Sequence, residues 1–251
     1  MKYLIARVKF VWRTRGIPGI LLAIWRRIVF YGFVFPYSMA GHLLARRFRK
    51  PKQPDFSFRG RTYEYLYHPH NFTWNNERTV EVPIVWESVR SATENGKRVL
   101  EVGNVLAFYY PISHDVLDKY ERGEGLINED VLRFRPKGKY DIIVSISTME
   151  HVGWDPPDES EPDKIRDSLL NLKKALAPGG EMIVTMPLGW NPEMDKRLFS
   201  GELPFDAEYF LQRIDAKNRW EEIPKEKARG SRYGKPFHAA NAIVVGIIRN
   251  P

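Results

Sequence analysis

The chain has 251 residues, 43% of them hydrophobic, which is enough for one packed α/β domain with an appendage. It contains no cysteine, which excludes disulfides, thiolate metal sites and cysteine nucleophiles. The formal net charge is +8, but residues 1–52 hold twelve of the 39 Lys and Arg and none of the 31 Asp and Glu. The rest of the chain therefore has a net charge of about −4, which does not favour nucleic acid as a partner.

The amino-terminal segment, residues 1–52, is basic and rich in apolar residues. Residues 28–45 carry no charged side chain, a length that is marginal for a bilayer span, and Pro36 interrupts them. Residues 16–27 are amphipathic and basic, as in helices that lie among anionic headgroups. The segment therefore predicts peripheral or monotopic attachment to an anionic membrane surface. Packing on the body or on a partner chain, and a true span, are the alternatives.

Residues 53–97 predict a cap and a lead-in helix. Aromatic residues alternate on both sides of Arg59-Gly60, which indicates a β-hairpin that turns there. The spacing of apolar residues predicts a helix from about Pro83 to Asn95, which Gly96 stops.

The remaining residues, 98–251, predict a parallel sheet. Three runs rich in β-branched residues, 98–103, 140–146 and 176–185, are typical of buried parallel strands, which place binding loops at their carboxyl ends. Residues 114–118 predict a further strand, and residues 161–176 a helix. Residues 219–224 and 241–250 predict the last two strands, as an antiparallel pair.

The order and spacing of RVLEVG, YDIIVSI and LAPGGEMIVT resemble the class I S-adenosylmethionine (SAM) dependent methyltransferases, over roughly residues 80–251. The resemblance implies a Rossmann-like doubly wound sheet of seven strands and SAM as the cofactor. The chain departs from the family's glycine motif, because Val105 and Ala107 stand at the later glycine positions. We therefore expect another path for this loop, with Asn104 in the left-handed conformation that Asn tolerates. A nicotinamide cofactor would call for G-x-G-x-x-G, which is absent.

The resemblance also implies which residues hold SAM. Gly103 would let the backbone approach the ligand, Asp118 would accept both hydrogens of the ribose diol, and Asp130 would accept the adenine amino group. The polar stretch before the lead-in helix would either line the cofactor cleft or form a solvated, capped loop. The predicted cofactor residues are Glu101, Gly103, Asn104, Asp118, Asp130 and Ser147, with Asn75, Asn76, Glu77, Arg78 and Glu81 as candidates from the polar stretch.

The strand at 140–146 leads into STMEHV, which resembles the catalytic edge of many small-molecule methyltransferases. His151 is the candidate general base, because its ordinary pKa suits proton abstraction at neutral pH. Alternatively, it packs beside the cofactor and orients the loop. Candidates for contacting substrate are Glu150, Trp190, Tyr233 and His238, although residues 231–240 also fit a plain connecting loop. No metal is expected, since His68 and His70 alone are weak evidence for a site.

A longer string, YEYLYHPHNFTWNNERTVEVPI with EVGNVLAFY and HDVLDKYE, is similar to prokaryotic methyltransferase-like proteins of surface-glycan assembly. This resemblance implies O-methylation of a sugar or lipid-linked glycan at the cytoplasmic face of the membrane. Two other functions stay open. A membrane scaffold could keep the fold without the cofactor, as the missing glycines suggest, and a nucleic-acid methyltransferase could use the same architecture.

Overall fold

The computed structural model describes residues 55–154, 161 and 163–251. The basic segment predicted to associate with a membrane, residues 1–52, lies outside these described residues, so that interpretation stays a prediction. Within the described ranges, no helix combines the length and the hydropathy that crossing a bilayer requires.

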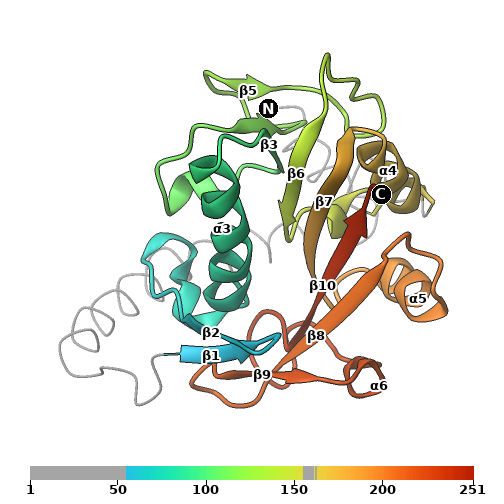
Figure 1. The fold of residues 1–251 in the computed structure, drawn as a ribbon. Coiled ribbons are helices and arrows are strands. Elements are labelled where there is room, and N and C mark those ends of the chain that lie inside the picture. Colours follow the sequence, from blue (N-terminus) through green and yellow to red (C-terminus); the bar gives the residue numbers. More distant parts are fainter. Residues whose placement is uncertain (1–54, 155–160, 162) are drawn as a thin grey trace, which may run out of the picture. The chain divides into compact units, whose positions relative to one another are not determined.

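The described part of the chain forms one large mixed sheet of eight strands (Figure 1). Five neighbouring strands run parallel, and the strand beside the last of them is reversed. The order across the sheet is β5 (Leu126–Ile127), β4 (Asp115–Leu117), β3 (Val99–Val102), β6 (Tyr140–Ile146), β7 (Leu176–Pro187), β10 (Ala242–Arg249), β8 (Ala207–Arg213) and β9 (Trp220–Ile223).

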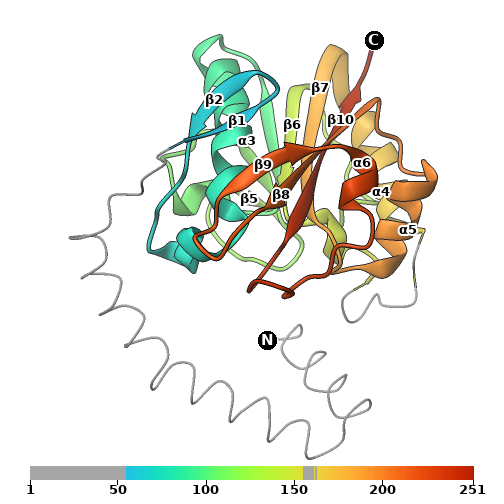
Figure 2. The same ribbon diagram turned by 90° about the horizontal axis from the view of Figure 1, so that it is seen from below.

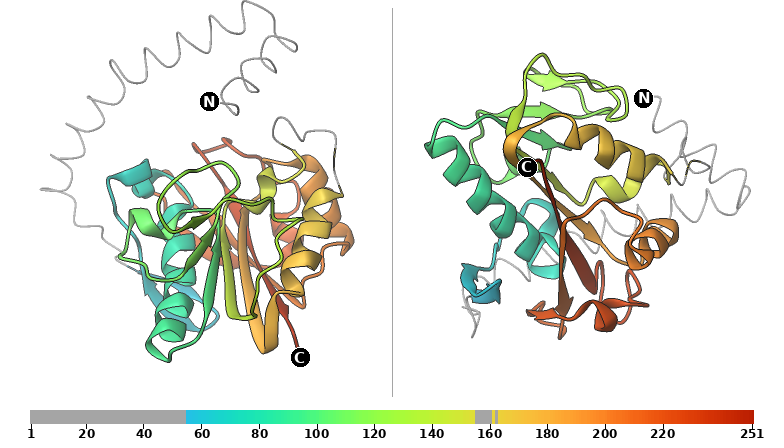
Figure 3. Two further views of the ribbon diagram at one scale, coloured as in Figure 1. Left: turned by 90° about the horizontal axis from the view of Figure 1, so that it is seen from above. Right: turned by 45° about the vertical axis from the view of Figure 1, so that its right-hand side comes forward.

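Helices cover both faces of this sheet. Helix α3 (Arg78–Glu94) lies on one face, and α4 (Lys164–Lys173) and α5 (Pro192–Ser200) lie on the other (Figure 3). Because successive side chains of a strand point to opposite faces, Ile143 and Val144 of β6 belong to different apolar clusters. The central strands are therefore buried on both sides, as the continuous apolar runs predicted.

The predicted hairpin is confirmed as β1 (Asp55–Phe58) and β2 (Arg61–Glu64). Arg59 and Gly60 both have positive φ values, 51° and 73°, as a tight two-residue hairpin turn requires. The hairpin packs near the β8–β9 edge of the sheet (Figure 2). There Phe58 meets the ring of Tyr209 edge-on. The cap is thus fixed to the carboxyl-terminal strands.

The helix predicted from Pro83 begins five residues earlier, at Arg78. Proline has no N–H to donate to the carbonyl of Thr79, four residues before it, and normally disrupts a helix interior. Here the backbone N–H of Leu66 donates to the Thr79 carbonyl at 3.0 Å instead. A donor from the cap therefore compensates for the proline, which the sequence pattern could not indicate.

The carboxyl-terminal strands correct the sequence interpretation. The predicted pairing of residues 219–224 with 241–250 is wrong, because β10 lies between β7 and β8, and β9 pairs only with β8 at the edge. Strand β8 was not predicted, because AEYFLQR shows no regular alternation of polar and apolar residues. The sheet accordingly has eight described strands where seven were expected. Helix α4 is also shorter than the predicted 161–176, and a short helix α6 (Lys225–Ala228) follows β9.

Candidate functional site

Most of the predicted site residues follow the carboxyl ends of the parallel strands. Gly103 follows β3, Asp118 follows β4 and Ser147 follows β6, while Trp190 comes soon after β7. In open α/β sheets this edge is where ligands bind. The short 3-10 turns η3 (Leu106–Phe108) and η4 (Met149–His151) also leave the sheet here.

The turn after β3 depends on two residues. Gly103 has φ +86°, and a Cβ atom there would lie 2.2 Å from Oγ1 of Thr148, so only glycine fits. The buried carboxylate of Glu101 accepts the N–H groups of Val105 and Leu106, both at 2.8 Å. Its other oxygen faces Nε2 of His114 at 3.0 Å. Glu101 therefore stabilises the turn. Both of its carboxylate oxygens are occupied by these contacts and are not available to a ligand.

The loop after Gly103 differs from the expected conformation. Asn104 is not left-handed, because Gly103 itself supplies the positive φ, and that expectation is corrected. Leu106 is fully buried, whereas Phe108 is 43% exposed and stacks on His70. The buried Oδ1 of Asn104 has no hydrogen-bond partner among the described residues. An acceptor atom beside the turn is therefore available to a donor from a ligand.

The two predicted nucleoside carboxylates lie in different settings. Asp118 is half-buried, and its Oδ1 accepts the N–H groups of Tyr120 and Glu121. Asp130 pairs with Lys119 at 2.9 Å and accepts the N–H of Leu132. Burial would raise the pKa of Asp130, but these hydrogen bonds lower it on balance. Asp118 follows the end of β4, and the nucleoside roles of both carboxylates stay predictions.

Three buried groups connect α3 to the end of β6. The hydroxyl of Ser147 donates to the Glu81 carboxylate, with oxygen distances of 2.7 and 2.9 Å, although Ser147 has a strained φ of 38°. Arg78 pairs with the same carboxylate at 2.9 Å. Burial would lower the pKa of Arg78, but Glu81 and Glu77 raise it, so its charge persists. Of the polar stretch, Arg78 and Glu81 reach this edge, and Glu77 accepts the N–H of Ala240.

A second cluster, comprising Glu150, His151, Trp190 and Tyr233, lies beside the first. Nε2 of His151 is 3.5 Å from Oε1 of Glu150, and the His151 ring meets the Trp190 ring edge-on. Trp190 in turn contacts Tyr233, with ring centroids 4.9 Å apart. Burial raises the pKa of Glu150 to about 7, while His151 lowers it and Glu81 raises it. The sequence therefore identified four residues that the fold brings together.

His238 is exposed, and its described contact is made by its carbonyl, which accepts a hydrogen bond from Arg213 at 2.8 Å. No described contact joins its side chain to the cluster. Arg213, which sequence reasoning missed, is 4% exposed and also donates to the carbonyl of Asn75. The guanidinium thus ties the cap to the loop that carries Tyr233.

Two other residues that shape the site gave little signal in the sequence. Gly189 has φ +78°, and a Cβ there would lie 2.5 Å from the backbone nitrogen of Tyr233. Asn191 caps α5 and donates from Nδ2 to the carbonyl of Glu150 at 2.9 Å. These contacts fix Trp190, between the two residues, relative to Glu150 and Tyr233.

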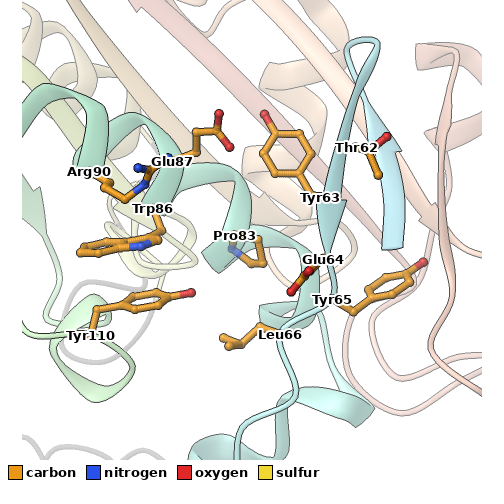
Figure 4. A pocket seen from close by; sticks show the side chains of 10 residues that line it. All are labelled: Thr62, Tyr63, Glu64, Tyr65, Leu66, Pro83, Trp86, Glu87, Arg90 and Tyr110. Carbon is orange, nitrogen blue, oxygen red and sulfur yellow. The ribbon is translucent and has the colours of Figure 1, made fainter. Parts of the chain in front are cut away.

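A groove of about 260 Å³ lies elsewhere, between the hairpin and the outer face of α3 (Figure 4). The rings of Trp86 and Tyr110 stack at 4.1 Å on one side of it. None of the predicted site residues lines this groove, so we place the candidate site where the polar chemistry converges. The groove is lined by Thr62, Tyr63, Glu64, Tyr65, Leu66, Pro83, Trp86, Glu87, Arg90 and Tyr110.

Across the residues that the structure describes, no group of three or more metal-ligating side chains is arranged to hold an ion.

The fold is a Rossmann-like doubly wound sheet with β10 reversed beside β7. No family model and no curated protein matches the sequence. Among solved structures, the chain is similar to the N-methyltransferase NodS from Bradyrhizobium japonicum in complex with S-adenosyl-L-homocysteine, at 15% identity and a TM-score of 0.41 over 66% of this chain and 85% of that one. A SAM-dependent methyltransferase from Clostridium acetobutylicum matches at 12% identity and a TM-score of 0.35, over 65% and 89%. These likenesses are too low to assign an activity.

Proposed function

We propose that this chain is a SAM-dependent methyltransferase that methylates a hydroxyl of a sugar or lipid-linked glycan. The observation that carries the proposal is the convergence of Gly103, Ser147 and the Glu150–His151 pair at one edge of a methyltransferase-type sheet. Ligands of such sheets bind at this edge. The acidic body, in contrast, gives no support to a nucleic-acid substrate.

The residues beside β3 and β4 fit SAM as the cofactor. The orphaned Oδ1 of Asn104 can accept a hydrogen bond from a donor such as the ammonium or a ribose hydroxyl. Asp118, at the end of β4, stands where a carboxylate can accept both hydrogens of a ribose diol. Glu101 is a positioning residue in this scheme, since its oxygens hold the turn. When bound, SAM supplies an electrophilic methyl group on a sulfonium.

His151 would remove the proton of the acceptor hydroxyl. Its imidazole would receive the proton, with Nε2 lying 3.5 Å from Oε1 of Glu150. Glu150 orients the imidazole and stabilises the imidazolium that forms, as a carboxylate partner does in other His-based sites. The deprotonated acceptor oxygen would thereby be prepared to take the methyl group that bound SAM would supply. Most of the rate would come from positioning of the two ligands and exclusion of water.

The proposed location is the inner face of the cell membrane, where a lipid-linked acceptor would be accessible to the enzyme. The basic and apolar composition of residues 1–52 supports this proposal through the attraction of cationic amphipathic segments to anionic lipid. Flotation of the full chain and of a chain lacking residues 1–52 with vesicles containing anionic lipid tests it. We expect the full chain to float with the vesicles and the shortened chain to remain behind. If neither chain floats, the proposed location is contradicted, while the enzymatic proposal is unaffected.

Calorimetric titration of the full chain with SAM and with S-adenosyl-L-homocysteine tests the cofactor. Saturable binding of both is expected, and Asp118→Asn should weaken it, whereas Asp206→Asn at the opposite end of the sheet should not. No heat with either ligand would instead favour the non-catalytic scaffold, a reading to which the departure from the glycine motif lends some support. Transfer of labelled methyl from SAM to a panel of sugar nucleotides and lipid-linked sugars then identifies the acceptor.

A further inference from the structure

In addition to Oδ1 of Asn104, two buried polar atoms on either side of His151 have no hydrogen-bond partner in the described structure. They are Oε2 of Glu150, a residue that is 1% exposed, and Nε1 of Trp190. A buried polar atom without a partner costs about 1–3 kcal/mol. Native proteins rarely leave such groups unsatisfied. Both residues contact His151, so the two atoms together point to a ligand at this site.

The two atoms have opposite requirements. The indole Nε1–H of Trp190 can only donate, so the ligand must present an acceptor to it. The Glu150 oxygen calls for a donor while the carboxylate is ionised. An ammonium group offers donors alone, and an ether or carboxylate offers acceptors alone. A hydroxyl group offers both, and so it can satisfy Glu150 and Trp190 at once.

This bridging hydroxyl is distinct from the one that reacts. The reacting oxygen must direct its proton to His151 and a lone pair to the methyl group, which leaves it poorly placed to bridge two further protein groups. We propose, building on the proposed methyl transfer, that the acceptor is a vicinal diol: one hydroxyl faces His151, and its neighbour donates to Glu150 and accepts from Trp190. Trp190 is then the residue that determines specificity.

The surroundings of Trp190 fit a ring that carries such a diol. His151 and Tyr233 contact the indole edge-on from two directions, so aromatic surface borders the polar atoms. A pyranose presents apolar C–H groups beside its hydroxyls and can use both kinds of surface. The Asn191 bond to the Glu150 carbonyl and the close approach at Gly189 hold Glu150 and Trp190 at a fixed separation. The site is therefore built before the ligand arrives.

Indole N–H resonances of the ¹⁵N-labelled full chain provide the test. Each of the seven tryptophans contributes one indole N–H signal. Trp190→Phe identifies the signal of Trp190 by its disappearance while keeping an aromatic ring. The protein is saturated with S-adenosyl-L-homocysteine and titrated with the methyl glycosides of mannose, glucose and galactose, which together present cis and trans diols. The comparison ligand is 3-hydroxytetrahydropyran, a ring of the same size with one hydroxyl.

We expect at least one glycoside to move the Trp190 signal, the single-hydroxyl ring to leave it in place, and Trp190→Phe to weaken glycoside binding about tenfold. Trp86→Phe, in the groove on the outer face of α3, is the matched control and should change nothing. If the Trp190 signal ignores every glycoside, or responds equally to the single hydroxyl, the diol inference is overturned although the homocysteine derivative still binds. Failure of that derivative to bind instead overturns the proposed function.

Discussion

Gly103 and Thr148 lie so close that a single added methyl group at position 103 would come within 2.2 Å of the threonine hydroxyl. The contact joins the turn after β3 to the loop after β6. The two loops that would border the cofactor are therefore fixed against each other, and glycine is required at position 103 for packing as well as for its φ of +86°.

Gly103→Ala should consequently destabilise the protein more than an ordinary glycine replacement. The matched control is Gly96→Ala, where φ is +68° but no atom lies within 4 Å of the added Cβ. Both changes should cost about 1–2 kcal/mol from left-handed strain, and Gly103→Ala about 1–3 kcal/mol more from the collision. Urea unfolding measures the difference. Adding Thr148→Ala should recover part of the extra loss, and strict additivity would contradict the contact.

Glu150 should make stability depend on pH. Burial raises its pKa to about 7, above its ordinary value of 4.5, so the folded state binds the proton more tightly than the unfolded state. Its contribution to the free energy of unfolding is therefore fully present below about pH 4.5 and is lost as pH rises through about 7. Relative to Glu150→Gln, the wild type should lose roughly 3 kcal/mol at most over this window. Parallel stability curves in urea unfolding at several pH values would refute the shift.

His151→Asn should lower turnover by about 10²–10⁴-fold, as removal of a general base does. Affinity for S-adenosyl-L-homocysteine should stay unchanged, since the imidazole is assigned to the acceptor's proton. Single-turnover transfer of labelled methyl measures the first effect, and calorimetry measures the second. Unchanged turnover would reject the base, and a parallel loss of affinity would favour the alternative in which His151 packs beside the cofactor.

Arg213→Met should be strongly destabilising. The guanidinium is buried and donates to the carbonyls of Asn75, Asp215 and His238, which would lose their donor. The expected cost is about 3 kcal/mol in urea unfolding. Arg249→Met is the control, because that side chain is 48% exposed and its ion pair with Glu181 is worth little. Equal effects of the two changes would argue against the buried connection.

The sequence predicted the central strands to within a residue or two because they are dense in β-branched residues and end at glycine or polar turns. It also predicted that Glu150, His151 and Trp190 would lie at one edge, since parallel strands end there. Of the two loop candidates for substrate contact, Tyr233 joins them, whereas no described contact joins the His238 side chain to them. It failed at β8, where polar and apolar residues do not alternate regularly, and at the start of α3. Both the Leu66 bond that accommodates Pro83 and the buried Arg213 depend on partners distant in sequence, which local patterns do not reveal.

The hydrogen bond from Leu66 to the Thr79 carbonyl has a consequence for ligand traffic. If the segment after the hairpin moved outward, the Thr79 carbonyl would lose the hydrogen bond from Leu66. Pro83 has no N–H to replace that donor within the helix. The cap is therefore expected to stay in place when ligands bind. Ligands of the proposed enzyme should therefore enter and leave without movement of the hairpin, and mutations that loosen the hairpin should leave their exchange rates unchanged.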